Sequence, residues 1–219
     1  MQDSEDIVTD RARVTTELAG LGLTDAILRD SISAAIAEAS RTTLNDPKTA
    51  FGYIFWQTAV RFIRQSLTSS GNDWERRDRR GFPTIVNKAL EIAIGVSSGD
   101  AAVGLREHEP RTRNSKGPEI EEIIRRNQLS FHDFVDLPED DPLRPPVQPK
   151  ETYLLIYYYD ELKRETRSEL ALPIRMDSDG LISGWKRRLI LEAIAHEPAA
   201  TADGEDDQNY NPDVRPKTG

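Results

Sequence analysis

Two polar stretches in the middle of the chain contain the residues best suited to bind an anion. One stretch follows Trp74, and the other precedes the pair Gly117-Pro118. Their basic residues are Arg76, Arg77, Arg79, Arg80, Arg106, Arg111, Arg113 and Lys116. A guanidinium group forms paired hydrogen bonds with a phosphate or a carboxylate. These eight residues therefore predict a phosphate- or partner-binding site.

The distribution of charge agrees with this prediction. The chain has 29 basic and 38 acidic residues and a formal net charge of -9. Residues 61–126, however, contain 13 basic and 10 acidic residues. We expect this segment to contact a protein partner of acidic character, with nucleic acid as the alternative partner. Solvated loops with local ion pairs are the favoured structural interpretation of the same residues, because Glu75, Asp78 and Glu119 lie nearby in the sequence.

One further pattern could hold a catalytic metal ion. The triplet Glu161-Leu162-Lys163 follows a predicted strand, and Asp141 lies upstream in a proline-rich stretch. In metal-dependent nucleases, acids hold Mg²⁺ and a lysine can stabilise charge at the phosphate. Such a site needs a rigid strand, whereas the polar residues around the triplet are typical of a turn. We therefore predict no catalytic residue and no metal site, and nuclease activity is the least favoured alternative.

The sequence gives little support for other catalytic groups or for a cofactor. The chain has no cysteine, which excludes disulfides, thiol catalysis and cysteine-bound metals. His108, His132 and His196 do not have the spacing of metal ligands. The glycine-rich stretch 95–100 lacks the lysine of a phosphate-binding loop. We predict no cofactor.

Helical patterns dominate the first 135 residues. Apolar residues recur at helical spacing in residues 5–20, 24–39, 47–67, 82–93 and 119–127, which predicts about five helices. The third stretch is apolar nearly all round, so we expect Trp56 to be buried at the centre of a bundle. Trp74, which lies beside four arginines, is expected to matter far less for folding.

The second half of the chain has a different composition. Five prolines between residues 136 and 150 predict an extended strap or linker. Residues 151–196 predict an antiparallel meander of about three strands, with a turn at Asp179-Gly180. Residues 197–219 predict a disordered acidic tail. The expected fold is α+β: an N-terminal bundle of about five helices in residues 1–135, packed with a small C-terminal antiparallel sheet.

These features favour a non-enzymatic binding protein, an accessory subunit of a larger bacterial assembly. A nucleic-acid-contacting protein that uses the arginine-rich loops is the alternative, followed by a metal-dependent nuclease. No apolar run approaches the ~18 residues that a membrane span needs, and the acidic start does not predict a secretory signal. We expect a cytoplasmic protein without membrane contact. Nucleic acid would require the eight basic residues to converge on one face.

Overall fold

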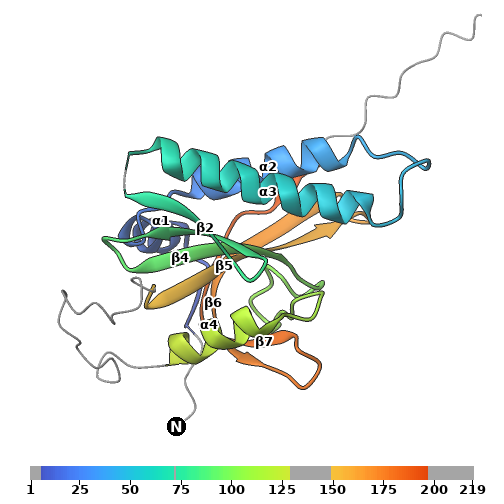
Figure 1. The fold of residues 1–219 in the computed structure, drawn as a ribbon. Coiled ribbons are helices and arrows are strands. Elements are labelled where there is room, and N and C mark those ends of the chain that lie inside the picture. Colours follow the sequence, from blue (N-terminus) through green and yellow to red (C-terminus); the bar gives the residue numbers. More distant parts are fainter. Residues whose placement is uncertain (1–5, 72, 129–148, 197–219) are drawn as a thin grey trace, which may run out of the picture.

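A computed structural model describes residues 6–71, 73–128 and 149–196. These ranges contain four helices and one eight-stranded mixed sheet (Figure 1). The helices are α1 (Arg11–Gly20), α2 (Asp25–Ala39), α3 (Ala50–Ser69) and α4 (Pro118–Gln128). The strands are β1 (Asp6–Val8), β2 (Trp74–Arg79), β3 (Phe82–Asn87), β4 (Ile92–Ser98), β5 (Glu151–Asp160), β6 (Glu165–Met176), β7 (Ile182–Ile190) and β8 (Ile194–Ala195). The expected five-helix bundle with a three-stranded sheet is therefore wrong, although helices and strands are both present.

The sheet has the strand order β1-β7-β6-β5-β4-β3-β2, and the short β8 pairs with β6. Neighbouring strands are antiparallel except for two parallel pairs, β1 with β7 and β4 with β5. Strands β5, β6 and β7 follow one another as antiparallel neighbours, but they lie in the interior of the large sheet rather than forming a small separate one. Strand β2 forms one edge of the sheet.

Helices α2 and α3 cover one face of the sheet, and α4 lies against the other face (Figure 1). Helix α2 begins at Thr24, whose side-chain oxygen accepts a hydrogen bond from the backbone N–H of Ile27 at 3.2 Å. Leu28 and Ile32 lie one turn apart on α2 and are fully buried, which places this stripe against the sheet.

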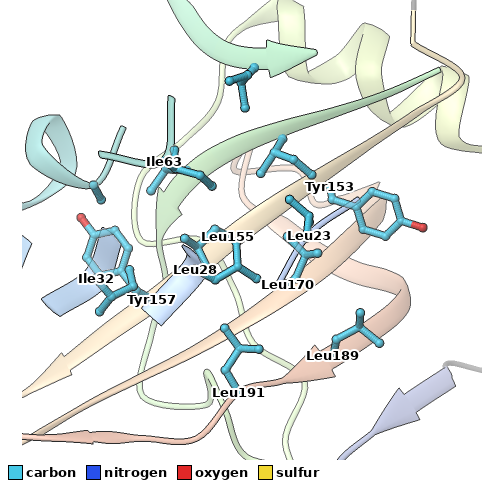
Figure 2. Close-up of a cluster of buried hydrophobic side chains, with 14 of the residues drawn as sticks. Leu23, Leu28, Ile32, Ile63, Tyr153, Leu155, Tyr157, Leu170, Leu189 and Leu191 are labelled. Carbon is cyan, nitrogen blue, oxygen red and sulfur yellow. The ribbon is translucent and has the colours of Figure 1, made fainter. Parts of the chain in front are cut away.

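The larger hydrophobic core lies between these two helices and the sheet. Figure 2 shows Ile32 and Ile63 from the helices near Leu155 and Tyr157 of β5. The ring of Tyr157 stacks on the ring of Phe55 from α3, with centroids 4.2 Å apart. Burial of large side chains on both sides of this layer contributes about 1.5–3 kcal/mol each, so the layer is the main source of stability.

A buried ion pair fastens the loop of residues 99–117 to the opposite face. Arg188 of β7 is fully buried and donates hydrogen bonds to both carboxylate oxygens of Glu169 on β6, at 2.9 and 2.8 Å. It also donates to the carbonyl oxygens of His108 at 2.9 Å and Leu105 at 3.1 Å. Glu169 accepts a further hydrogen bond from the backbone N–H of Gly104 at 3.0 Å. The pair therefore links two strands and the loop that crosses them.

Residues 82–93, which predict a helix, instead form β3 and the start of β4. In the turn between them, Glu91 has a φ of 54° and the side chain of Asn87 accepts a hydrogen bond from the N–H of Leu90 at 3.0 Å. A strand that is covered on both faces carries a continuous apolar run, which periodicity alone does not separate from a buried helix. Pro83 and the β-branched residues that follow it favour the strand.

Trp56 and Trp74 have the opposite of their expected roles. Trp74, at the start of β2, is 6% exposed and belongs to the core beneath α3. Trp56 is only partly buried, at the margin of the same core, and its indole N–H donates to the carbonyl oxygen of Val96 at 3.2 Å. The expectation that Trp56 is central and Trp74 peripheral is wrong, because the sheet, not a helix bundle, provides the centre.

Three sequence expectations concern residues that the structure does not describe. The proline-rich strap at 136–150 lies outside the described residues except for its last two positions, and the predicted acidic tail at 197–219 lies outside them entirely. His132 is also outside them. Within the described ranges, no helix has both the length and the apolar character that crossing a membrane requires.

Candidate functional site

The first arginine-rich stretch forms the edge strand β2 and the turn after it. Strand β2 pairs with β3 from Trp74 opposite Asn87 to Arg79 opposite Phe82. Side chains alternate between the two faces of a strand. Because Trp74 points into the core beneath α3, Arg76 lies on that face, whereas Arg77 and Arg79 lie on the face of α4. The sequence therefore distributes the stretch over both faces of one strand.

On the α3 face, Arg64 ties the helix to the strand. Its side chain is 14% exposed, and its Nη2 atom pairs with Asp78 at 2.9 Å. The same nitrogen donates to the carbonyl oxygens of Arg77 at 2.8 Å and Thr84 at 2.9 Å. This contact compensates the charge of Asp78 and holds β2 beneath α3. Arg76, on the same face, is exposed.

On the α4 face, a buried carboxylate is surrounded by arginines. Glu119 in the first turn of α4 lies 3.3 Å from the Nε atom of Arg79 and 4.0 Å from the Nη2 atom of Arg126. These three residues and Arg77 line a cavity of about 10 Å³, which is the size of one water molecule. Burial lowers the pKa of Arg126, and the carboxylates of Glu122 and Glu119 oppose this shift. This cluster is a closed structural contact, with no room for a ligand.

The second arginine-rich stretch is attached to the turn between β6 and β7. Arg111 forms an ion pair with Asp177 in the turn between β6 and β7, and its Nη2 atom lies 3.9 Å from Asp179. The hydrogen bond from Arg111 lowers the pKa of the Asp177 carboxyl. The backbone N–H of Lys116 donates to the carbonyl oxygen of Gly180 at 2.8 Å, and burial lowers the pKa of the Lys116 amine to about 8. Arg111 and Lys116 thus hold the β6–β7 turn.

The remaining basic residues of the second stretch, Arg106 and Arg113, are exposed. Between them, Thr112 is buried and forms an antiparallel bridge with Gly99, directly after β4. The two stretches therefore belong to different elements, β2 on one side and the ends of β4 and β7 on the other. Arg76 on the edge strand β2 and Arg80 in the turn after it are exposed, and they form the accessible part of the first stretch.

The metal-site pattern falls on a turn. Glu161 and Lys163 lie between β5 and β6, where Leu162 is 96% exposed and the N–H of Lys163 donates to the side chain of Asp160 at 3.0 Å. Asp141 lies outside the described residues. In the described ranges, no group of three or more acidic or histidine side chains is arranged to hold a metal ion. The described geometry gives no support to a nuclease site.

Sequence analysis did not predict the buried charges on the sheet. Glu169 and Arg188 are both fully buried, and Arg167 beside them on β6 is 5% exposed. The available signal was a charged residue within a strand of otherwise small and apolar residues, Ser168 to Leu172. A charge in such a strand is stable only with a partner, which here lies 19 positions away in the sequence and is brought close by the β6–β7 pairing.

Comparison with known protein families, with characterised proteins and with solved structures finds no match for this chain. The function must therefore be argued from the geometry of the described residues.

Proposed function

We propose that this protein is a binding or accessory subunit that holds an extended, acidic segment of a partner protein along the edge strand β2. One observation carries the proposal: β2 and the turn directly after it present the exposed side chains of Arg76 and Arg80, and in the described part of the chain β3 is the sole neighbour of β2 in the sheet. An edge strand offers backbone N–H and C=O groups to which an extended peptide can add as a further strand.

Charge supports an acidic occupant. Six arginines and five acids lie on β2 or next to it; the arginines are Arg64, Arg76, Arg77, Arg79, Arg80 and Arg126, and the acids are Asp73, Glu75, Asp78, Glu119 and Glu122. The whole chain is negative, so this edge differs in sign from the molecule around it. Complementary charge accelerates association and disfavours wrong partners.

A protein segment is favoured over nucleic acid for two reasons. A nucleic acid backbone cannot form the ladder of hydrogen bonds that an edge strand offers to a polypeptide. In addition, the formal net charge of -9 repels a polyanion that is still outside the screening length of ~8 Å. Nucleic acid binding remains the alternative function, and the same experiment separates the two.

The test is a fluorescence-anisotropy titration with a labelled peptide of about ten residues in which valine and glutamate alternate. The wild-type protein should bind this peptide at physiological salt. The double variant Arg76→Glu, Arg80→Glu should weaken binding at least tenfold, which corresponds to ~1.4 kcal/mol. Arg41→Glu with Lys48→Glu makes the same change in net charge at two exposed positions away from β2 and should leave the affinity unchanged.

Two further titrations complete the design. A peptide of the same sequence in which every backbone nitrogen is methylated has no N–H group to donate, so it should bind much more weakly. Equal affinity for both peptides would refute strand addition. Tight binding of duplex DNA, with a log–log salt slope of about -0.9 per phosphate and no binding of the acidic peptide, would replace the proposal with the nucleic-acid alternative.

A further inference from the structure

The charge pattern of strand β2 matches a second copy of the same strand. Its six residues read WERRDR, and β3 pairs with all of them on one side. On the other side, no strand of the described residues lies beside β2. Two such edges can pair antiparallel about a twofold axis perpendicular to the sheet, so that each face of the sheet continues into the second copy. Directly opposite residues then share a face.

One register of this pairing sets opposite charges against each other on both faces. Its twofold axis passes between Arg77 and Arg77 of the second copy. On the α3 face, Arg76 then lies opposite Asp78 of the second copy. On the α4 face, Glu75 lies opposite Arg79 of the second copy. Symmetry repeats both contacts, which gives four pairs of opposite charge against one pair of like charge.

The neighbouring registers are less favourable. Because opposite residues must share a face, the axis moves by one whole residue at a time. With the axis at Arg76, only Glu75 and Arg77 make pairs of opposite charge within the strand. With the axis at Asp78, every pair within the strand has like charge, since Arg77 faces Arg79 and Asp78 faces its own copy. Charged edges usually prevent edge-to-edge pairing, whereas this pattern favours one register over the others.

The side chains of Arg76 and Asp78 are available for the contact. Arg76 is exposed and has no ion pair among the described residues. Asp78 pairs with Arg64, but its side chain is 67% exposed, so its carboxylate can accept a second guanidinium group. On the α4 face, Glu75 and Arg79 already have partners within their own chain. The contact between Arg76 and Asp78 is therefore the main one.

We propose that β2 binds β2 of a second copy of this chain and joins the two sheets into one. The contact involves a single strand from each copy, so we expect a reversible dimer that forms as the protein concentration rises. A partner segment on the same edge would have to displace the second copy. The dimer does not rest on the proposed function, because it is measured without any peptide.

The test is sedimentation velocity on the full-length protein from about 1 µM to about 1 mM. The average mass of the wild-type protein should rise toward that of two chains. Arg76→Asp and Asp78→Arg each set like charges against each other and should raise the dissociation constant of the dimer at least tenfold. Arg41→Asp makes the same charge change as the first variant at an exposed position away from β2, and it should have no effect.

A mixture of the two β2 variants tests the register. The Arg76→Asp chain has acids at positions 76 and 78, and the Asp78→Arg chain has arginines at both. Each variant alone should stay monomeric, whereas an equimolar mixture should dimerise with an affinity close to that of the wild type. Circular dichroism checks the fold, and Asp78→Asn, which keeps an acceptor for Arg64, should weaken the dimer without disturbing the strand.

Three results would overturn the proposal. The first is a monomeric wild-type protein over the whole concentration range. The second is a dimer that Arg76→Asp leaves unchanged, because the contact would then lie on another surface. The third is a mixture of folded variants that stays monomeric, because complementary charge across β2 would then not hold the two copies together.

Discussion

The buried ion pair between Arg188 and Glu169 provides the sharpest test of the fold. Replacing Arg188 with methionine removes four hydrogen bonds: two to Glu169 and one each to the carbonyl oxygens of His108 and Leu105. It also leaves the Glu169 carboxylate buried without its cation. Removing one partner of a buried pair costs about 3–5 kcal/mol. For a domain with a typical stability of ~5–15 kcal/mol, that is a large share of the total.

The assay is urea unfolding followed by circular dichroism, and the neighbouring residue is a matched control. Arg187 is adjacent on β7, but its side chain is 36% exposed and pairs with Asp6 and Glu17 at the surface. Arg187→Met should therefore cost no more than ~1 kcal/mol. The double variant Arg188→Met, Glu169→Leu should be more stable than Arg188→Met alone, because no unpaired charge stays buried.

The ion pair also has a local signature. Glu169 accepts the N–H of Gly104, and Arg188 holds two carbonyl oxygens of the same loop. In Arg188→Met, the Gly104 amide should exchange with solvent faster, and trypsin should cut more rapidly after Arg106. A loss of less than ~1 kcal/mol in the free energy of unfolding, with unchanged amide exchange at Gly104, would refute the reasoning. It would mean that water reaches the ion pair or that the pair does not hold the loop.

Three further results are expected. Trp74→Ala should lower the free energy of unfolding by about 3–5 kcal/mol, and Trp56→Ala by clearly less, since Trp56 is only partly buried; equal losses in urea titrations would contradict this core. Burial lowers the pKa of Lys116 to about 8 from 10.5. Between these two pH values the unfolded chain binds more protons than the folded one, so the contribution of Lys116 to the free energy of unfolding rises with pH. Lys116→Met should remove this rise in thermal melts taken from about pH 7.5 to ~9.5. Gly99→Ala places a Cβ atom 2.4 Å from the Val103 side chain and should destabilise the protein by ~1–3 kcal/mol. The control Gly52→Ala adds a Cβ atom on helix α3 that meets nothing within 4 Å, and it should stabilise the protein by ~0.5–1 kcal/mol in thermal unfolding.

Local signals in the sequence account for the four helices in the described part of the chain, including α4, for which the spacing predicts residues 119–127. Thr24 before an amphipathic run places the start of α2, and the spacing of Leu28 and Ile32 identifies its buried side. The same reasoning fails for residues 82–93, because a strand that is buried on both faces has no alternation to read. In this stretch β3 pairs with its sequence neighbours β2 and β4, and β4 in turn pairs with β5, more than 50 residues away.

The candidate site on β2 depends on strand pairing in the same way. The basic character of the two arginine stretches is visible in the sequence, but the alternation of Arg76 and Arg77 across β2 appears only once that stretch is known to be a strand.

The parallel pairing of β4 with β5 has a consequence for synthesis of the chain. Strand β4 ends at Ser98 and its partner β5 begins only at Glu151. At about 5–20 residues per second, a ribosome needs roughly 3–10 s to make the residues between them. During that interval the nascent β2–β3–β4 ribbon has an open edge at β4, where the backbone N–H and C=O groups that later pair with β5 have no partner strand. That interval is when the nascent chain most needs a chaperone, and slower translation of residues 99–150 would lengthen it.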